Sequence, residues 1–68
     1  MKNVIKVERA RQNMTQAELA GKVKVARQTI IAMEAGRFVP SAMLAFKIAA
    51  VLSCKADEIF ELEDEDWL

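Results

Sequence analysis

The most constraining feature of this sequence is an apolar pattern over residues 16–35 that stops and then restarts. Leu19 and Val23 lie one helical turn apart before the break. Ile30 and Met33 are spaced in the same way after it. A single long amphipathic helix would continue its stripe through the break. The pattern therefore predicts two short helices that each bury one face, joined by a tight turn.

A polar cluster, Arg27-Gln28-Thr29, opens the second of these helices, and Val25 lies in the break before it. We expect Val25 to fill the angle where the two helices cross. Two helices joined in this way form a helix-turn-helix, whose second helix enters the major groove of DNA. The pattern thus predicts double-stranded DNA as the partner.

The size and composition of the chain indicate one small domain. Sixty-eight residues lie near the lower limit for a self-supporting core, and a hydrophobic content of 53% suits a compact helical bundle. No apolar run approaches the ~20 residues that cross a bilayer, and the N-terminus is charged, unlike a signal peptide. Cys54 is the only cysteine. We therefore expect a cytoplasmic protein without a membrane partner.

Charge divides the chain into two parts, although its formal net charge is zero. Residues 1–47 carry nine Lys or Arg against three acids, a balance of +6. Residues 48–68 carry one lysine against seven acids, a balance of −6. A basic body is compatible with DNA on one face, provided that the acidic end lies elsewhere. We therefore divide the chain into a helix-turn-helix domain, residues 1–60, and an acidic tail, residues 61–68.

The first two helices are delimited by residues with specific backbone preferences. We expect the first helix over residues 4–12, ended by Asn13, which tolerates the left-handed conformation. Thr15 then opens the second helix. Its side chain and that of Glu18, three residues later, form the capping box T-x-x-E.

The second half of the chain carries similar signals. Gly36 is expected to close the third helix, and Ser41, directly after Pro40, is a good cap for the fourth. Asp57 to Phe60 predict one more short helical turn. From Phe60 to Glu63 the apolar period changes to two, which is typical of a short strand.

Taken together, these residues closely resemble the Cro/lambda-repressor-like (Xre-type) transcriptional regulators, and in particular their minimal one-domain members. The resemblance covers about residues 4–60. The matching positions are Arg9, Thr15-Gln16-x-Glu18-Leu19-Ala20, Val25-x-Arg27-Gln28-Thr29-Ile30, Glu34-x-Gly36, Pro40-Ser41, Leu44-Ala45-x-Lys47-Ile48-Ala49 and Glu58-Ile59-Phe60. The resemblance implies an all-α, five-helix bundle that binds an inverted-repeat operator as a homodimer, most often as a repressor. In some short members the segment after the last helix pairs with the N-terminus, so residues 60–63 and 2–5 are candidates for a two-stranded β-ribbon.

The resemblance also implies roles for individual residues. Its base-contacting positions are Gln16, Arg27, Gln28, Thr29 and Ala32. Arginine can bond guanine O6 and N7 together, glutamine can bond adenine in the same way, and small side chains can touch a thymine methyl. The positions expected to hold phosphates are Thr15, Lys22, Lys24 and Arg37, although a solvated surface fits each of these cations nearly as well. Arg9 and Glu34 match a largely buried salt bridge, which we interpret as structural.

Three positions differ from the usual pattern of this family. Lys24 stands where glycine is common, so it is expected to adopt a left-handed conformation at a cost of ~1 kcal/mol. Ala26 replaces the Ser or Thr that caps the recognition helix, and losing that cap costs ~1 kcal/mol. Ile31 occupies a usually polar, exposed position, where it either meets DNA or is simply an exposed apolar residue. We interpret Cys54 and the four methionines as core packing.

The acidic tail admits three interpretations. Asp64 to Asp66 fit a solvated, frayed end. Phe60 and Leu62, with Trp67 left open, fit a dimer interface, a kind of contact in which tryptophan is enriched. The run of acids also fits electrostatic steering that turns the wrong face away from DNA.

The sequence leaves two alternatives to DNA-binding regulation. The runner-up is a protein-interaction module, such as an antitoxin or an anti-regulator, that grips a partner protein through the acidic tail. An enzyme is the weakest alternative, because the chain has no histidine or tyrosine and no set of nucleophile, base and orienting group. The sequence indicates neither a cofactor nor a metal site.

Overall fold

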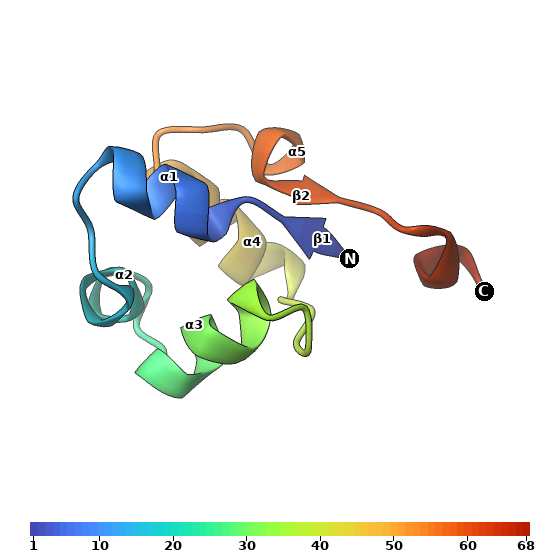
Figure 1. Cartoon of the computed structure of the whole chain (residues 1–68), viewed down its shortest axis with the longest axis horizontal. Helices are drawn as coiled ribbons and strands as arrows, with labels where there is room; N and C mark the ends of the chain where they lie inside the picture. Colours follow the sequence, from blue (N-terminus) through green and yellow to red (C-terminus); the bar gives the residue numbers. More distant parts are fainter.

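The structure is a computed structural model that describes all 68 residues (Figure 1). Its five helices are α1 (Ile5–Arg11), α2 (Gln16–Val23), α3 (Arg27–Glu34), α4 (Ala42–Val51) and α5 (Ala56–Ile59). Two short strands, β1 (Lys2–Asn3) and β2 (Phe60–Glu61), pair beside them, and a 3-10 turn, η1 (Asp64–Trp67), follows. The predicted five-helix bundle with a β-ribbon joining the termini is confirmed. None of the helices combines the length and apolar character needed to cross a membrane.

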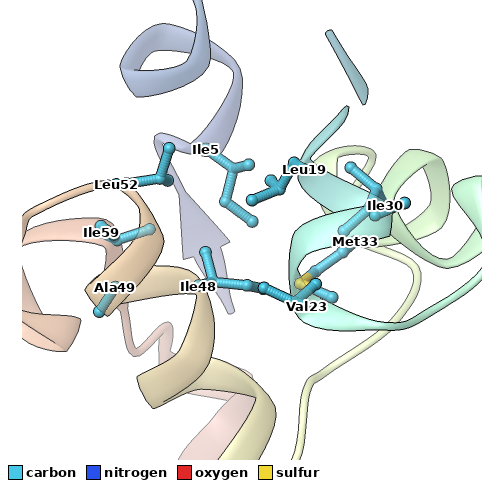
Figure 2. Packing of buried hydrophobic residues seen from close by; sticks show 10 residues of the cluster. Ile5, Leu19, Val23, Ile30, Met33, Ile48, Ala49, Leu52 and Ile59 are labelled. Atoms are coloured by element: carbon cyan, nitrogen blue, oxygen red, sulfur yellow. The ribbon is translucent and has the colours of Figure 1, made fainter. Parts of the chain in front are cut away.

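One hydrophobic core holds the helices together. It consists of ten apolar residues drawn from all five helices, and Figure 2 shows their side chains converging: Ile5, Leu19, Ala20, Val23, Ile30, Met33, Ile48, Ala49, Leu52 and Ile59. No polar or charged residue is buried among them. Because burial of apolar surface is the main stabilising term, this core sets the positions of α2 and α3 relative to the rest of the bundle.

The predicted N-terminal caps are present. The Oγ1 atom of Thr15 accepts the Glu18 amide at 3.0 Å, and a Glu18 carboxylate oxygen accepts the Thr15 amide at 2.9 Å. The hydroxyl of Ser41 accepts the Leu44 amide at 3.2 Å. Each cap satisfies a backbone donor that a helix leaves free, so α2 and α4 begin at defined residues.

Four helices end in the same way, on a residue with positive φ: Asn13 (52°), Lys24 (61°), Gly36 (77°) and Ser53 (56°). After each of them the next amide bonds the carbonyl five residues earlier, as in Arg37 N–H to Ala32 O at 2.9 Å. Only one of these four positions is a glycine, although glycine alone adopts this conformation without a steric cost. The helix ends expected at Asn13 and Gly36 are confirmed.

The two termini meet at one end of the molecule. Strands β1 and β2 are antiparallel, with Lys2 opposite Glu61 and Asn3 opposite Phe60. The Met1 ammonium then lies 3.0 Å from a Glu63 carboxylate oxygen and 3.1 Å from one of Asp66. The expectation of a frayed end at residues 64–66 is wrong, since these residues form η1 and are tied to the opposite terminus. Pairing of β1 with β2 brings the ammonium within reach of the acids.

The methionines do not all fill the core. Met33 is buried and Met14 is half-buried, but Met43 remains 68% exposed. Met43 lies in the first turn of α4, on the side opposite the buried Ile48 and Leu52. The outward side of α4 is thus apolar as well, which the interpretation of all four methionines as packing residues did not anticipate.

Candidate nucleic-acid interface

Helices α2 and α3 form the predicted helix-turn-helix, and they pack directly on each other. The turn between them depends on Lys24, whose backbone adopts the left-handed conformation (φ 61°, ψ 48°). Val25 follows and is half-buried against the core. The reversal that the interrupted apolar pattern predicted is therefore made by a left-handed lysine and an inserted valine.

Helix α3 buries one side and exposes the other. Ile30 and Met33 are completely buried, whereas Arg27 and Gln28 at its N-terminal end are exposed. Successive helical residues are about 100° apart, so Gln28 points away from the buried pair and Arg27 lies at the edge nearer α2. The two side chains that were expected to read bases are thus both accessible.

The outward side of α3 becomes apolar after its first turn. Ile31 and Ala32 are half-buried there, and Thr29 is half-buried at the flank. Ile31 is therefore not the exposed residue that the sequence suggested, because its neighbours cover part of it. The surface of α3 one turn after Gln28 is therefore apolar, which suits close contact with the methyl group on the edge of a thymine base.

The start of α3 lacks a side-chain cap. Ala26 has the extended backbone of an N-cap residue (φ −68°, ψ 149°), as Thr15 and Ser41 have at α2 and α4, but its methyl group accepts no hydrogen bond. The Thr29 amide bonds the Ala26 carbonyl at 3.0 Å instead, and the amides of Arg27 and Gln28 remain available to a ligand or to solvent.

An ion pair ties α1 to the end of α3. The guanidinium of Arg9 forks onto Glu34, with Nε 2.6 Å from Oε2 and Nη2 3.1 Å from Oε1. Its remaining Nη1 donates to the Met14 carbonyl at 2.8 Å. The side chains retain only 12% and 8% exposure. The structure thus contains the paired Arg9 and Glu34 that the resemblance implied, with a bidentate geometry that fixes both groups.

Gln16 extends this pair towards the exposed end of α3. Its Nε2 donates to Oε1 of Glu34 at 3.0 Å, and its Oε1 accepts from Nη2 of Arg27 at 3.4 Å. One chain of contacts therefore runs from Arg9 through Glu34 and Gln16 to Arg27. The orientation of the Gln16 amide follows from its partners, because a carboxylate can only accept hydrogen bonds and a guanidinium can only donate them.

The surroundings of Glu34 favour the ionised form of its carboxyl group. Burial by itself raises its pKa, but hydrogen bonds from Arg9 and Gln16, together with the charges of Arg9 and Lys6, outweigh this effect. The pKa of Glu34 accordingly lies below its ordinary value. The acceptor that orients Gln16 is therefore ionised at neutral pH.

The expected phosphate-binding residues surround the two helices. Thr15, Lys22, Lys24 and Arg37 are all exposed. Thr15 and Gln16 also line a shallow hollow between Arg9 and Arg27 at the N-terminal end of α2. The Thr15 oxygen accepts the α2 cap bond, which leaves its hydroxyl hydrogen free to donate.

The residues expected at a dimer interface differ in their surroundings. Phe60 is half-buried and packs against the core. Leu62 and Trp67, by contrast, are 54% and 75% exposed. Phe60 thus contributes to the stability of the single chain, while the other two present free apolar surface.

Sequence reasoning missed a contact that holds the C-terminal end of α3. The side-chain amide of Asn3 in β1 donates to the Met33 carbonyl at 2.8 Å, and its oxygen accepts the Ile5 amide at 3.3 Å. No local signal reveals this contact, since the partners are 30 residues apart. The ribbon between the termini therefore also supports the end of α3.

Comparison with known proteins agrees with this architecture. A helix-turn-helix family, HTH_3, matches residues 5–59, which run from the start of α1 to the end of α5. The chain belongs to this helix-turn-helix family. An uncharacterized HTH-type transcriptional regulator of Methanocaldococcus jannaschii is 52% identical over 66 residues, covering 97% of this chain and all of the relative. The uncharacterized HTH-type transcriptional regulator YgzD of Bacillus subtilis is 46% identical, with the same coverage of both chains.

A third relative of this helix-turn-helix family is an uncharacterized HTH-type transcriptional regulator of Archaeoglobus fulgidus. It is 47% identical, over 97% of this chain and 93% of its own length. The chain thus resembles these HTH-type regulators along almost its whole length, tail included. The family match itself ends at residue 59, before Phe60 and the acids of the tail.

Proposed function

We propose that this protein is a sequence-specific DNA-binding transcriptional regulator that places α3 in the major groove. The observation that carries the proposal is the exposed pair Arg27 and Gln28 at the start of α3, with Arg27 oriented by Gln16. Arg27 would bond a guanine and Gln28 an adenine, while Thr29 and Ala32 approach thymine methyl groups. An arginine already oriented by a neighbour loses less side-chain entropy when it binds a base.

The backbone of the DNA would be held from both sides of α3. Lys22 lies in the last turn of α2 and Lys24 lies in the turn before the recognition helix, while Arg37 follows the C-terminal end of that helix. Thr15 and the hollow at the start of α2 would receive a further phosphate. The acidic tail lies at the other end of the long axis from α2 (Figure 1), so its charge does not oppose DNA at this surface.

We further propose that the protein acts as a homodimer on an inverted-repeat operator and represses by occupying it. Two copies related by a twofold axis present two α3 helices to successive major grooves, with half-sites about one helical turn, ~34 Å, apart. Occupancy alone blocks access to the DNA, so repression needs no catalytic group or cofactor.

Selection from random DNA duplexes tests this proposal. The full chain should enrich an inverted repeat whose half-sites contain a guanine and an adenine within reach of Arg27 and Gln28. The variant Arg27→Ala/Gln28→Ala should lose that preference and stay folded. Arg11→Ala is the matched control, because it removes an equally charged, exposed arginine that lies on α1. Equal preference in wild type and in Arg27→Ala/Gln28→Ala would refute the assignment.

A second candidate function rests on Trp67. This aromatic side chain is 75% exposed next to the acids of η1, as a docking group for a partner protein would be. On this alternative the protein is an antitoxin-like or anti-regulator module whose tail grips that partner. Trp67→Ala should then abolish partner binding and leave DNA selection intact, whereas the DNA-binding proposal expects no loss of regulation from this variant.

A further inference from the structure

The second turn of α3 offers no hydrogen-bonding side chain on its outward side. Figure 1 shows α3 at the edge of the bundle, and Gln28 points away from the buried side of this helix. Because successive helical residues are about 100° apart, Ile31 lies about 60° to one side of Gln28 and Ala32 about 40° to the other. Ala35, two turns after Gln28, lies nearly in line with it. The outward side of α3 thus changes from an amide to methyl and methylene groups within one turn.

Ile31 is not needed by the core. It is half-buried, but it belongs neither to the ten core residues nor to the partly buried side chains that pack against them. It is also a β-branched residue inside a helix, where alanine or lysine would be a better helix former. Neither core packing nor helix propensity therefore accounts for Ile31. A residue that departs from local preference in this way indicates a functional surface.

We propose that Ile31 is a specificity-determining residue that contacts the C5-methyl group of a pyrimidine in the major groove. Thymine and 5-methylcytosine both carry this group, so the affinity for the operator responds to cytosine methylation as well as to base sequence. The inference rests on the proposed function, because it names the chemical group that the second turn of α3 recognises.

The apolar character of this second turn favours a methyl group over every other feature of a base edge. In the major groove adenine, guanine and cytosine present hydrogen-bond donors and acceptors, whereas thymine adds a methyl group to its acceptor. Isoleucine cannot bond a donor or an acceptor, and covering such a group without a partner costs free energy. Covering a methyl group is favourable. Uracil and cytosine lack the methyl group of thymine and 5-methylcytosine, so they should bind less well at this position.

Ile31 suits this contact better than Ala32 does. A β-branched side chain has one strongly preferred χ1 rotamer in a helix, so Ile31 loses little side-chain entropy when it meets a base. Ala32 carries a single methyl group close to the backbone and extends less far from α3. Ile31 also lies four residues after Arg27, about 6 Å along the helix, against about 3.4 Å for each base-pair step. With α3 along the groove, the methylated pyrimidine lies within about two base pairs of the guanine that Arg27 bonds.

The test uses the full chain and the duplex that it selects from random DNA, with each thymine replaced in turn by deoxyuridine. Fluorescence anisotropy should show that wild-type affinity falls about fourfold at one thymine near the guanine, the effect of leaving one methyl group uncovered. Ile31→Ala should bind the thymine and uracil duplexes equally at that position, and Ile31→Val should still prefer thymine. Val7→Ala is the matched control, because it shortens an exposed β-branched side chain on α1 and should discriminate like wild type.

A second series distinguishes the two sources of the methyl group. The same base pair is changed from thymine–adenine to cytosine–guanine, with and without a methyl group at C5 of the cytosine. Wild type should bind the methylated duplex about fourfold more tightly than the unmethylated one, and Ile31→Ala should bind both equally. Discrimination of thymine from uracil without discrimination of 5-methylcytosine from cytosine would overturn the response to methylation and restrict the site to thymine.

Failure of this inference is distinguishable from failure of the proposed function. If wild type selects an operator but tolerates uracil at every thymine, DNA binding stands and only the methyl contact is excluded. If Ile31→Ala weakens binding to all duplexes equally and keeps the preference for thymine, Ile31 contacts the sugar-phosphate backbone and the assignment is wrong. If wild type selects no DNA at all, the proposed function fails and this inference fails with it. Alanine favours a helix more than isoleucine does, and Ile31 lies outside the core, so Ile31→Ala should fold, which circular dichroism checks.

Discussion

Gln16, the first residue of α2, donates a 3.0 Å hydrogen bond to Glu34, the last residue of α3. The same carboxylate is gripped by Arg9, and the other end of the Gln16 amide faces Arg27. The ion pair between Arg9 and Glu34 stabilises the bundle, and through Gln16 the same Glu34 carboxylate also orients the exposed Arg27. On the proposed function, the stability of the bundle and the recognition of DNA are therefore coupled through one carboxylate.

Removing that carboxylate should destabilise the fold. Glu34→Ala leaves Arg9 largely buried without its partner, which should lower the free energy of unfolding by about 3 kcal/mol. Urea denaturation followed by circular dichroism measures the loss. Glu8→Gln is the control: it weakens the pair with Arg11, whose side chain is 71% exposed against 16% for Glu8, and should cost less than about 1 kcal/mol. Equal losses of unfolding free energy in the two variants would show that the Arg9–Glu34 pair stabilises the fold no more than the Glu8–Arg11 pair does.

The free energy of unfolding should also depend on pH through the ionisation of Glu34. Because the pKa of Glu34 is lowered on folding, its contribution is present above the ordinary value of 4.5 and is lost as pH falls through the folded value. Wild type should therefore lose stability on acidification more steeply than Glu34→Gln. Parallel acid titrations of the two proteins would contradict this role.

Gln16→Ala should affect recognition more than stability. Gln16 is half-buried at a helix start, so alanine should change the free energy of unfolding by no more than about 1 kcal/mol. Arg27 would lose its orienting acceptor, and preference for the selected operator over a random duplex should fall about tenfold. Fluorescence anisotropy with both duplexes measures the ratio. Gln12→Ala, which removes a glutamine bonded to the Leu52 carbonyl away from α3, is the control and should leave the ratio unchanged.

Lys24→Gly should stabilise the protein and weaken its grip on DNA. Glycine relieves the left-handed backbone at φ 61°, for a gain of about 0.5–1 kcal/mol after its greater unfolded-state entropy is deducted. The loss of one cation should lower the slope of log affinity against log salt by about 1. Lys22→Gly removes a neighbouring lysine inside α2 and should instead destabilise by about 1 kcal/mol. We therefore expect the melting temperature to rise in Lys24→Gly and to fall in Lys22→Gly.

Ala26→Ser should supply the missing cap of α3. Ala26 already has the extended backbone of an N-cap, so serine can bond a first-turn amide and add about 1 kcal/mol. For a domain of this size that raises the melting temperature by about 4–8 °C. Ala26→Val, which offers no acceptor, should bring no gain. A serine variant with an unchanged melting temperature would mean that the bond from the Thr29 amide to the Ala26 carbonyl already stabilises this helix start as well as a side-chain cap does.

Attachment of the tail should weaken in alkali. Hydrogen bonds from the Met1 ammonium to Glu63 and Asp66 raise the pKa of that ammonium above its ordinary 8.0. The contact is therefore complete below pH 8.0 and is lost as pH rises through the folded pKa. Trp67 emission and anisotropy should report release of η1 over that range. Acetylation of the N-terminus should release the tail at neutral pH already, and an acetylated protein with unchanged Trp67 signals would contradict the contact.

Much of the fold followed from local chemistry in the sequence. The capping box at Thr15, the left-handed Lys24 and the glycine at the end of α3 are all governed by neighbours within five residues. Core residues such as Leu19 and Ile30 were evident from helical periodicity, because burial repeats with the helix itself. Arg9 with Glu34 was implied only by resemblance to a family, as their separation of 25 residues carries no local signal.

Other features were decided only by tertiary packing. Gln16 reaches Glu34 and Arg27 because α2 packs across α3. Met1 reaches Asp66 because β1 pairs with β2. The apolar pattern of α4 did not reveal that Met43 and Phe46 face outward, since the core needs only one side of that helix. Local rules determine where helices begin, end and become apolar. Which apolar side is covered, and which distant polar groups meet, depends on how the helices pack.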